Sequence, residues 1–269
     1  MAKVAEMIRV VICMKQVLDP EAPVSTFKVD PEAKQAITPT GTPPVLNPFD
    51  ENALEAALRI KDTKGAEITV ISMGRNLARP VVKKALAAGA DELILLESDV
   101  FENFDSYSTA YTLANAIKKT GEYDLILCGR QAADTNAGQV GSLIAEILDI
   151  PSITIARKIE VDNGKVRVER IVSDGYEVIE ATLPALVTVS NEAGELRFPT
   201  MTGIIAAQKM SVNVWNAQDI GAIRSQLKRT NLLKLFIPVH EVRCQIIKGE
   251  SPEEAAGNLA LELRKEKII

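Results

Sequence analysis

Short apolar runs alternate with amphipathic segments along the first half of the chain. Runs with the length and composition of buried strands lie at residues 10–14, 67–72, 92–96 and 125–128. Segments that place apolar residues three and four positions apart, as on one face of a helix, lie at residues 50–61, 79–88, 106–119 and 141–148. This order predicts an α/β fold with a doubly wound, mostly parallel sheet and right-handed crossovers. Asp50 is the expected N-cap of the first helix, and Gly89 the expected end of the second.

The pattern changes at Pro151. Short runs of β-forming residues follow at 153–155, 158–161, 165–171, 177–182 and 186–189. Asn163-Gly164 and Asp174-Gly175 separate some of these runs, and such pairs between β-forming residues are hairpin signals. We therefore expect the sheet to finish with antiparallel strands at one edge.

A long excursion interrupts the first repeat of the sheet. Residues 18–46 are rich in proline and poor in apolar residues, and a short hairpin is expected from 27–29 and 36–38. Loops of this length inside a domain are usually functional or disordered. We interpret the excursion as a lobe that reaches a partner or a cofactor.

The C-terminal part predicts an arm that ends in a helix. Residues 210–243, which include Trp215, have the pattern of an irregular extension. Ser251-Pro252-Glu253-Glu254 has the pattern of a helix start, with a serine N-cap, a proline in the first turn and a glutamate three residues after the cap. The predicted organisation is an α/β domain over residues 1–209 and an arm over 210–269 whose helix packs on a partner.

The loop after the fourth strand is the first candidate binding site. Gly129 ends the strand, and small and polar residues continue to Ser142, where a helix begins. Small side chains let backbone N–H groups approach an anion, and a helix N-terminus adds about half a positive charge. The loop has neither the lysine of a P-loop nor the G-x-G-x-x-G pattern. We interpret it as a nucleotide pocket rather than an ordinary connection.

Composition excludes several classes of protein. A net charge of −5 and few clustered cations argue against nucleic acid as a partner. Three scattered cysteines form neither a disulfide framework nor a metal cluster, and a reducing cytoplasm fits them best. No apolar run reaches the roughly 18 residues of a membrane span, so no membrane insertion is expected. The only histidine, His240, has no nucleophile near it in sequence, which favours a structural role and no catalytic residues.

Three stretches of the sequence resemble electron transfer flavoprotein β subunits. CGRQAADTNAGQVG at 128–141 resembles their adenine-nucleotide loop, and NPFDENA at 47–53 resembles the start of their first long helix. VERIVSDGYEVIEATLPALVT at 168–188 resembles the family signature, with Ser173 where an acid is usual. The resemblance extends from about Arg9 to Lys267. It implies an adenine-nucleotide α-hydrolase-like sheet and a heterodimer with an α subunit that holds most of a redox FAD.

Carried over by position, the resemblance implies a set of cofactor-binding residues. Lys15 begins the segment, up to about Pro23, that would touch the FAD. Asn136 and Gln139 are expected to bind phosphate or ribose, and Asp134 to hold the loop through backbone N–H groups. The residues implied at the nucleotide are Cys13, Asn47, Pro48, Phe49, Asp50, Met73, Gln131, Ala132, Asp134, Thr135, Asn136, Ala137, Gly138, Gln139, Val140, Gly141 and Ser142.

The resemblance leaves the nucleotide open. Some β subunits hold AMP in this pocket, whereas electron-bifurcating members hold a second FAD that meets NADH. The segment 134–139 departs from the Asp-Gly-Asp-Thr-Ala-Gln form of bifurcating members and from the longer acidic run of mitochondrial-type members. We favour AMP. An alternative of another class is a stand-alone nucleotide-sensing module of universal-stress-protein type, which leaves the excursion and the arm without a purpose.

The resemblance also implies a partner-binding loop. Residues 191–199 align with the loop by which the family grips acyl-CoA dehydrogenases, and Leu196 replaces its usual proline. The implied contact residues are Glu195, Leu196, Arg197 and Phe198. An exposed leucine or phenylalanine here is a candidate for a dominant contact, whereas a loop packed on its own sheet is the structural alternative.

Overall fold

The computed structural model describes residues 7–37, 41–101, 104–222, 229–238 and 244–269. Contacts divide the chain into two units, Met1–Leu235 and Phe236–Ile269. His240, for which a structural role is expected, lies outside the described residues.

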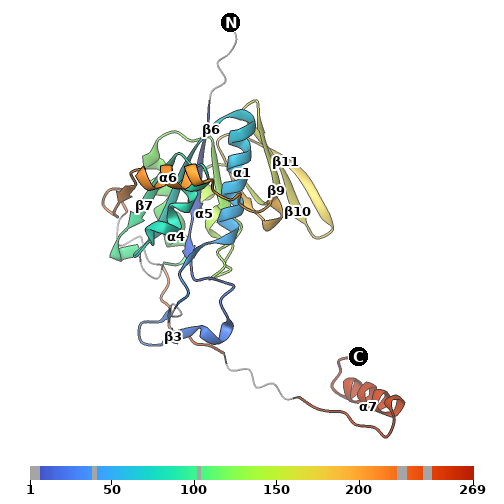
Figure 1. Cartoon of the computed structure of the whole chain (residues 1–269). Helices are drawn as coiled ribbons and strands as arrows, with labels where there is room; N and C mark the ends of the chain where they lie inside the picture. The colour runs from blue at the N-terminus through green and yellow to red at the C-terminus, as the bar shows by residue number, and fades with distance from the viewer. Residues whose placement is uncertain (1–6, 38–40, 102–103, 223–228, 239–243) are drawn as a thin grey trace. The chain divides into compact units, whose positions relative to one another are not determined.

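The described residues of the first unit form a nine-stranded sheet with the order β11-β10-β9-β12-β8-β1-β6-β7-β13 (Figure 1). In the part of this order from β9 to β13, all neighbouring strands are parallel. The sequence predicts this for β1, β6, β7 and β8, whereas the run at 186–189, expected with the antiparallel strands, forms a parallel strand between β8 and β9. The parallel strands are β1 (Ile8–Met14), β6 (Ala66–Gly74), β7 (Glu92–Glu97), β8 (Leu125–Gly129), β12 (Ala185–Val189) and β13 (Asn213–Trp215). The doubly wound, mostly parallel fold is therefore confirmed.

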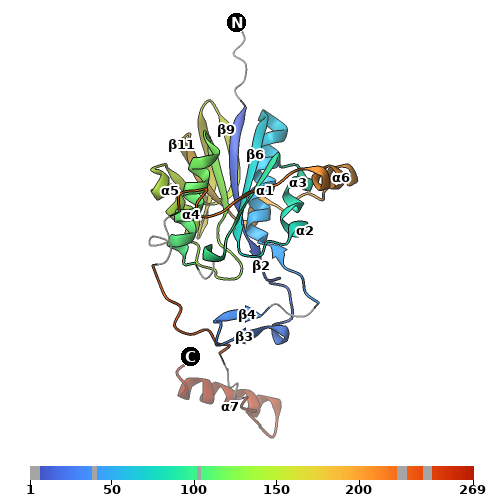
Figure 2. The same cartoon turned by 90° about the vertical axis from the view of Figure 1, so that its left-hand side faces the viewer.

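Helices cover both faces of this sheet (Figures 1 and 2). On one face α1 (Pro48–Lys64) buries Leu54 in a core with Ile12 of β1. On the other face α4 (Ser106–Thr120) and α5 (Val140–Leu148) enclose a second core that includes Val11 and Ile126. Alternate residues of β1 thus enter opposite cores, which explains why the strand is apolar from Val10 to Met14.

The antiparallel edge is also confirmed. Strands β9 (Ser152–Asp162), β10 (Lys165–Val172) and β11 (Gly175–Thr182) pair antiparallel in that order. The two runs at 153–155 and 158–161 belong to the single strand β9. Its pairing register with both neighbours shifts and Ile155 has a φ of 59°, so an irregularity in the strand interrupts the sequence pattern.

Two helix boundaries differ from the sequence predictions. The expected N-cap at Asp50 is wrong: α1 begins at Pro48 with Asn47 at the N-cap position, and Asp50 lies in the first turn. Proline is well suited to the first helical position, because its missing N–H would have no helical acceptor. The helix expected at 79–88 is divided at Lys83 into α2 (Arg79–Val82) and α3 (Lys84–Ala88). It ends at Gly89 as predicted, where φ is 126°.

The C-terminal half of the first unit contains more regular structure than the pattern indicates. Helix α6 (Met201–Lys209) was not predicted, and it packs against α3. β13 lies inside the segment that was expected to be irregular, and it pairs with β7 at the edge of the sheet.

The described residues also contain short 3₁₀ turns at η1 (Val24–Thr26), η2 (Asp99–Phe101) and η3 (Asn191–Ala193).

The excursion forms two small antiparallel pairs. β3 (Lys28–Asp30) pairs with β4 (Gln35–Ile37), which confirms the predicted hairpin. β2 (Gln16–Val17) pairs with β5 (Val45–Leu46), so the chain leaves and re-enters the domain at the same place.

The second unit contains the predicted terminal helix, α7 (Pro252–Lys265). The Ser251 hydroxyl accepts a hydrogen bond from the N–H of Glu254 at 3.2 Å, which confirms the N-cap. Leu259 and Leu261 on this helix are 47% and 67% exposed, so its apolar side chains are not covered within the described residues of the unit.

Candidate functional site

The candidate site lies where the sheet changes direction. From β1 the chain continues to β6 and β7 on one side, whereas β8 pairs with the other side of β1. The loops that follow β1 and β8 therefore leave the sheet in different directions. Open α/β sheets bind ligands at the carboxyl ends of strands at such a point, because the diverging loops leave a crevice.

Asn47 ties these two loops together. Its side chain is buried; its Nδ2 donates to the carbonyl of Gln131 at 2.9 Å, and its Oδ1 accepts from the N–H of Ala133 at 3.0 Å. Its own N–H donates to the carbonyl of Lys15 at 2.8 Å. One buried amide thereby fixes the loop after β8 relative to the segment after β1.

Asp50 makes a second link one helical turn further on. One carboxylate oxygen accepts from the N–H of Lys15 at 2.7 Å and the other from the N–H of Gly129 at 3.0 Å. Burial raises the pKa of Asp50 to about 7, and the hydrogen bonds only partly oppose this effect. A Cβ on Gly129 would lie 2.4 Å from Asp50 Oδ1, so this contact requires glycine at the end of β8.

Side chains of the two loops also pair with one another. Lys15 Nζ lies 2.8 and 2.7 Å from the two carboxylate oxygens of Asp134. Gln131 Nε2 donates to Asn136 Oδ1 at 2.9 Å. The structure thus brings together predicted residues from both loops. It places Asp134 on Lys15 rather than on backbone N–H groups, which corrects the expected role of this carboxylate.

The end of the loop presents backbone N–H groups. Asn136 and Gly138 have φ values of 50° and 63°, and α5 begins at Val140. In the described part of the chain, no acceptor lies within hydrogen-bonding distance of the N–H groups of Ala137, Gly138 or Gln139. These donors and the α5 N-terminus form the arrangement that binds phosphate in α/β folds.

The remaining predicted residues lie on or next to the strands and loops of the candidate site. Cys13 is buried beside Cys128 in the second core, and Met73 packs partly against the same core, so Cys13 can offer a ligand mainly its backbone. The neighbouring Cys13 thiol and burial raise the pKa of the Cys128 thiol. A Cβ on Gly141 would lie 2.5 Å from Thr188 Cγ2, so this glycine allows α5 to pack closely on β12. Ala132, Thr135 and Ser142 lie at the surface or half-buried, and Pro48 is exposed.

The structure adds Arg130 to the site. Its guanidinium lies 5.0 Å from the centre of the Phe49 ring, and its Nε is buried without a partner among the described residues. Arg130 was not among the residues predicted for the site, although its position directly after the glycine that ends β8 is a signal that could have identified it.

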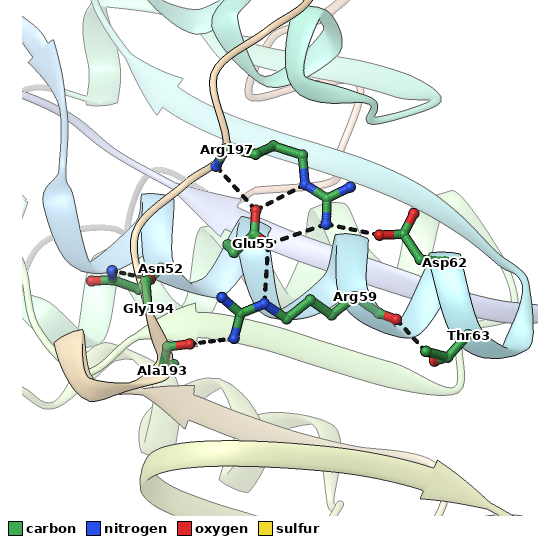
Figure 3. A network of polar contacts seen from close by, with 8 residues as sticks. All are labelled: Asn52, Glu55, Arg59, Asp62, Thr63, Ala193, Gly194 and Arg197. Atoms are coloured by element: carbon green, nitrogen blue, oxygen red, sulfur yellow. Dashed lines mark hydrogen bonds and ion pairs between the residues drawn. The ribbon is translucent and has the colours of Figure 1, made fainter.

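Residues 193–197 bind along the outer face of α1 (Figure 3). Glu55 accepts hydrogen bonds from the backbone N–H, Nε and Nη2 of Arg197 at 3.0–3.1 Å, and from Arg59 Nε at 3.0 Å. Leu196 packs partly against the first core, whereas Phe198 is 96% exposed. The structure therefore separates the expected contact residues into an inward leucine, an ion-paired arginine and an outward phenylalanine, with Glu195 exposed beside them.

Two further structural properties concern metal ions and membranes. The described residues contain no group of three or more His, Cys, Asp or Glu side chains placed to hold a metal ion. None of the helices in the described ranges has the length and apolar content that a membrane span requires.

The fold is that of an α/β protein of the doubly wound type, and the candidate ligand site lies at the switch between β1 and β8. A family model described as the electron transfer flavoprotein domain matches residues 36–220. The chain belongs to the electron transfer flavoprotein family, with β subunits among its relatives. Proteins of this family transfer electrons and generally bind a flavin and AMP.

Curated relatives match nearly the whole chain. The caffeyl-CoA reductase-Etf complex subunit CarD of Acetobacterium woodii is 39% identical over 266 residues, which cover 97% of this chain and 100% of the relative. The electron transfer flavoprotein subunit beta of Clostridium acetobutylicum is 40% identical over 266 residues, with 97% and 99% covered. The protein FixA of Azorhizobium caulinodans is 35% identical over 219 residues, with 79% and 76% covered.

Proposed function

We propose that this chain is the β subunit of a heterodimeric electron transfer flavoprotein. FAD lies at the interface with the α subunit, and AMP occupies the crevice of this chain. The heterodimer carries electrons between acyl-CoA dehydrogenase-type flavoenzymes and a redox acceptor. The chain itself is then a carrier subunit and not an enzyme.

The observation that carries this proposal is the double link between the loops of the crevice. Asn47 and Asp50 use buried side chains to hold the segment after β1 against the loop after β8. Such a link preorganises the unpaired N–H groups of Ala137, Gly138 and Gln139 for a phosphate. A single phosphate suits AMP, because Asp134 would repel further negative charge.

The segment after β1 is the part proposed to reach the FAD. Gln16 in β2 donates to the carbonyl of Asn76 at 3.1 Å and accepts from the N–H of Ala78 at 2.7 Å. Its neighbour Lys15 is fixed by Asp50 and Asp134. The segment therefore leaves the crevice in a defined direction, and one short stretch of chain would connect the AMP site with the flavin.

Counting nucleotides tests the proposal. The chain would be co-expressed with its α subunit, purified, denatured with acid, and its released FAD and AMP quantified per heterodimer. One FAD and one AMP are expected, together with electron transfer from an acyl-CoA dehydrogenase. A stable monomer of this chain that binds FAD tightly without the α subunit would contradict the heterodimer.

One relative favours a second candidate function. CarD, at 39% identity, is named as a subunit of a caffeyl-CoA reductase-Etf complex. In this alternative the crevice holds the ADP part of a second FAD, and the complex is an NADH-linked electron-bifurcating enzyme. Two FAD molecules and no AMP per heterodimer would support this alternative.

A further inference from the structure

Two cysteines lie side by side at the carboxyl ends of β1 and β8. Cys13 and Cys128 are the last pair in the register of these two parallel strands. Both side chains belong to the second core, so they point to the same face of the sheet. Both residues are free cysteines with exposed fractions of only 7% and 5%. Two thiols in this position form either a packing unit or a redox site.

The spacing of the two residues allows a disulfide. Neighbouring strands of a sheet lie about 4.7–4.9 Å apart. Disulfides join residues whose Cα atoms are about 4.4–6.8 Å apart, so two strand partners on one face are close enough to be bridged. The Cys128 thiol already makes a hydrogen bond with the Cys13 thiol. The two sulfur atoms are therefore neighbours before any bond forms between them.

The two thiols lie at the point where the strands separate. The Asp50 carboxylate accepts hydrogen bonds there from the N–H of Lys15 and from the N–H of Gly129, which directly follows Cys128. A Cβ on Gly141 would lie 3.7 Å from the Cβ of Cys128, so the first turn of α5 passes beside this thiol without a side chain to cover it. Neither cysteine is completely buried, in contrast to the residues that precede them, Ile12 and Leu127, at 0%.

Asp50 supplies an acid–base group beside the thiols. The hydrogen bond with Cys13 and burial raise the pKa of the Cys128 thiol well above its usual range, and the charges of Cys13 and Asp50 add to this effect. Cys128 therefore keeps its proton near neutral pH, which leaves Cys13 as the sulfur that attacks first. Burial raises the pKa of Asp50 to about 7, so this carboxylate can both accept and return a proton near neutral pH.

We propose that Cys13 and Cys128 form a redox-active dithiol, which hydrogen peroxide converts to a disulfide at the base of the crevice, with Asp50 as the acid–base group. The dithiol does not depend on the proposed function, because its chemistry uses neither FAD nor AMP. A packing unit requires only small apolar side chains, whereas this cluster combines two neighbouring thiols, a buried carboxylate and an incomplete cover. In a reducing compartment such a disulfide is transient and reports an oxidising event.

The oxidation balances in two steps. The Cys13 thiolate attacks one oxygen of the peroxide and the O–O bond breaks, which gives a sulfenic acid and a hydroxide that takes up the proton lost by Cys13. Cys128 then gives its proton to Asp50, and its sulfur attacks the sulfur of Cys13. The S–O bond breaks, and the leaving hydroxide takes the proton back from Asp50. Two thiols are thereby oxidised by two electrons, and one peroxide is reduced to two water molecules.

Mass spectrometry of the full chain, purified with its α subunit, tests the proposal. After treatment with excess hydrogen peroxide, the remaining thiols are alkylated and the protein is digested with trypsin without a reductant. The two cysteines lie in the tryptic peptides 10–15 and 120–130. We expect these peptides as one disulfide-linked species that dithiothreitol separates. The exposed Cys244 shows in the same digest how far the reagent has reacted.

Substitutions assign the separate roles. Cys128→Ser should leave Cys13 as a sulfenic acid that dimedone traps, because the second thiol is absent. Cys13→Ser should leave Cys128 unoxidised, because this thiol keeps its proton. Asp50→Asn should slow disulfide formation roughly tenfold or more but not the trapping of Cys13, since Asp50 acts in the second step. Glu51→Gln is the matched control, because Glu51 lies on the same helix but pairs with Lys84 at 2.7 Å.

The reaction is run on the protein as purified and again after charcoal has removed bound nucleotides, since a ligand in the crevice would shield the thiols. A linked pair in either preparation supports the proposal, and the cysteine variants support it even where Asp50→Asn does not fold. If both preparations keep the two peptides unlinked at a peroxide concentration that fully oxidises Cys244, the proposal is overturned. Separate sulfinic acids at Cys13 and Cys128 without a linked species would overturn it as well.

Discussion

Lys15 Nζ lies 2.7 Å from Asp134 Oδ2, and this ion pair spans the crevice between the loop after β1 and the loop after β8. The two residues are 119 positions apart in sequence, and only the sheet order brings them together. In the proposed function, Lys15 would contact the AMP phosphate, and the segment that it begins would reach the FAD.

Lys15→Met tests this dual position. The pair is partly exposed, with side-chain exposures of 42% and 32%, so its contribution to stability should be small, about 0–1 kcal/mol. A charge-assisted bond to a ligand phosphate contributes more, so AMP should dissociate roughly tenfold faster. The rate would be followed by nucleotide release after dilution of the heterodimer.

Lys64→Met is the matched control. Lys64 lies at the C-terminal end of α1, the opposite end from Asn47 and Asp50, and pairs with Asp162 of β9 at 2.9 Å. It should leave AMP retention unchanged. Equal retention in Lys15→Met and Lys64→Met would remove Lys15 from the phosphate site.

Gly138→Glu should expel the nucleotide through bulk and like charge. Gly138 has a φ of 63°, but a Cβ there would meet only the Arg130 carbonyl, at 3.6 Å. The loop without ligand therefore has room for a side chain, and the loss should appear in nucleotide content more than in packing. The decrease in melting temperature should match the loss of bound nucleotide, because a ligand that binds only the folded state stabilises it.

Gly164→Glu is the control, because it also places a side chain at a positive φ but lies in a hairpin turn outside the proposed nucleotide site. Gly164 has a φ of 72° in the turn between β9 and β10, with no atom within 4 Å of its added Cβ. This variant should keep full AMP or FAD content. If Gly138→Glu also keeps its nucleotide and its melting temperature, the phosphate does not bind at this loop.

Asp50 predicts a pH dependence of stability. Its pKa is raised from 3.8 to about 7 in the folded chain, so the folded state holds a proton that the unfolded state has lost over this interval. The contribution of Asp50 to the free energy of unfolding is therefore fully present below about pH 4 and lost as pH rises towards 7. Relative to Asp50→Asn, the wild type should lose on the order of 4 kcal/mol across this range.

Urea unfolding of both heterodimers at fixed concentration and several pH values measures this difference. The difference in the free energy of unfolding at a single pH is not the test, because the asparagine amide also leaves the N–H of Lys15 or of Gly129 without an acceptor. The test is how this difference changes with pH. Parallel curves between pH 4 and 8 would show that Asp50 is ionised throughout.

The sheet could be predicted from the sequence because its strands are buried on both faces and therefore appear as uninterrupted apolar runs. The order of the strands could not be predicted, because the apolar runs do not indicate that β8 pairs with β1 rather than with β7. α6 escaped prediction because most of its residues are exposed and only Ala207 is buried, which leaves no apolar stripe. Ile155 shows the same limit, because its irregular backbone divides one strand into two apparent runs.

The candidate site was predictable as a loop but not as a linked structure. Gly138 and the small residues around it, between a buried strand and a helix, made this loop a candidate phosphate site. The side-chain amide of Asn47 bonds to Gln131 and Ala133, more than eighty positions away, and a linear pattern does not contain such pairings. The bonds between Glu55 and Arg197 were equally hidden, because the two residues lie 142 positions apart.

Leu196→Ala separates the two parts of the partner-binding segment. Leu196 packs partly against the first core, so its truncation should destabilise the heterodimer by about 1–2 kcal/mol, less than the 2–5 kcal/mol typical of a fully buried leucine. Phe198→Ala, at a side chain exposed to 96%, should leave the melting temperature unchanged and raise the KM for the heterodimer. Calorimetry and dehydrogenase kinetics on the two variants should therefore give opposite patterns. If Leu196→Ala melts like the wild type and slows electron transfer instead, the leucine turns outward and is itself the contact with the dehydrogenase.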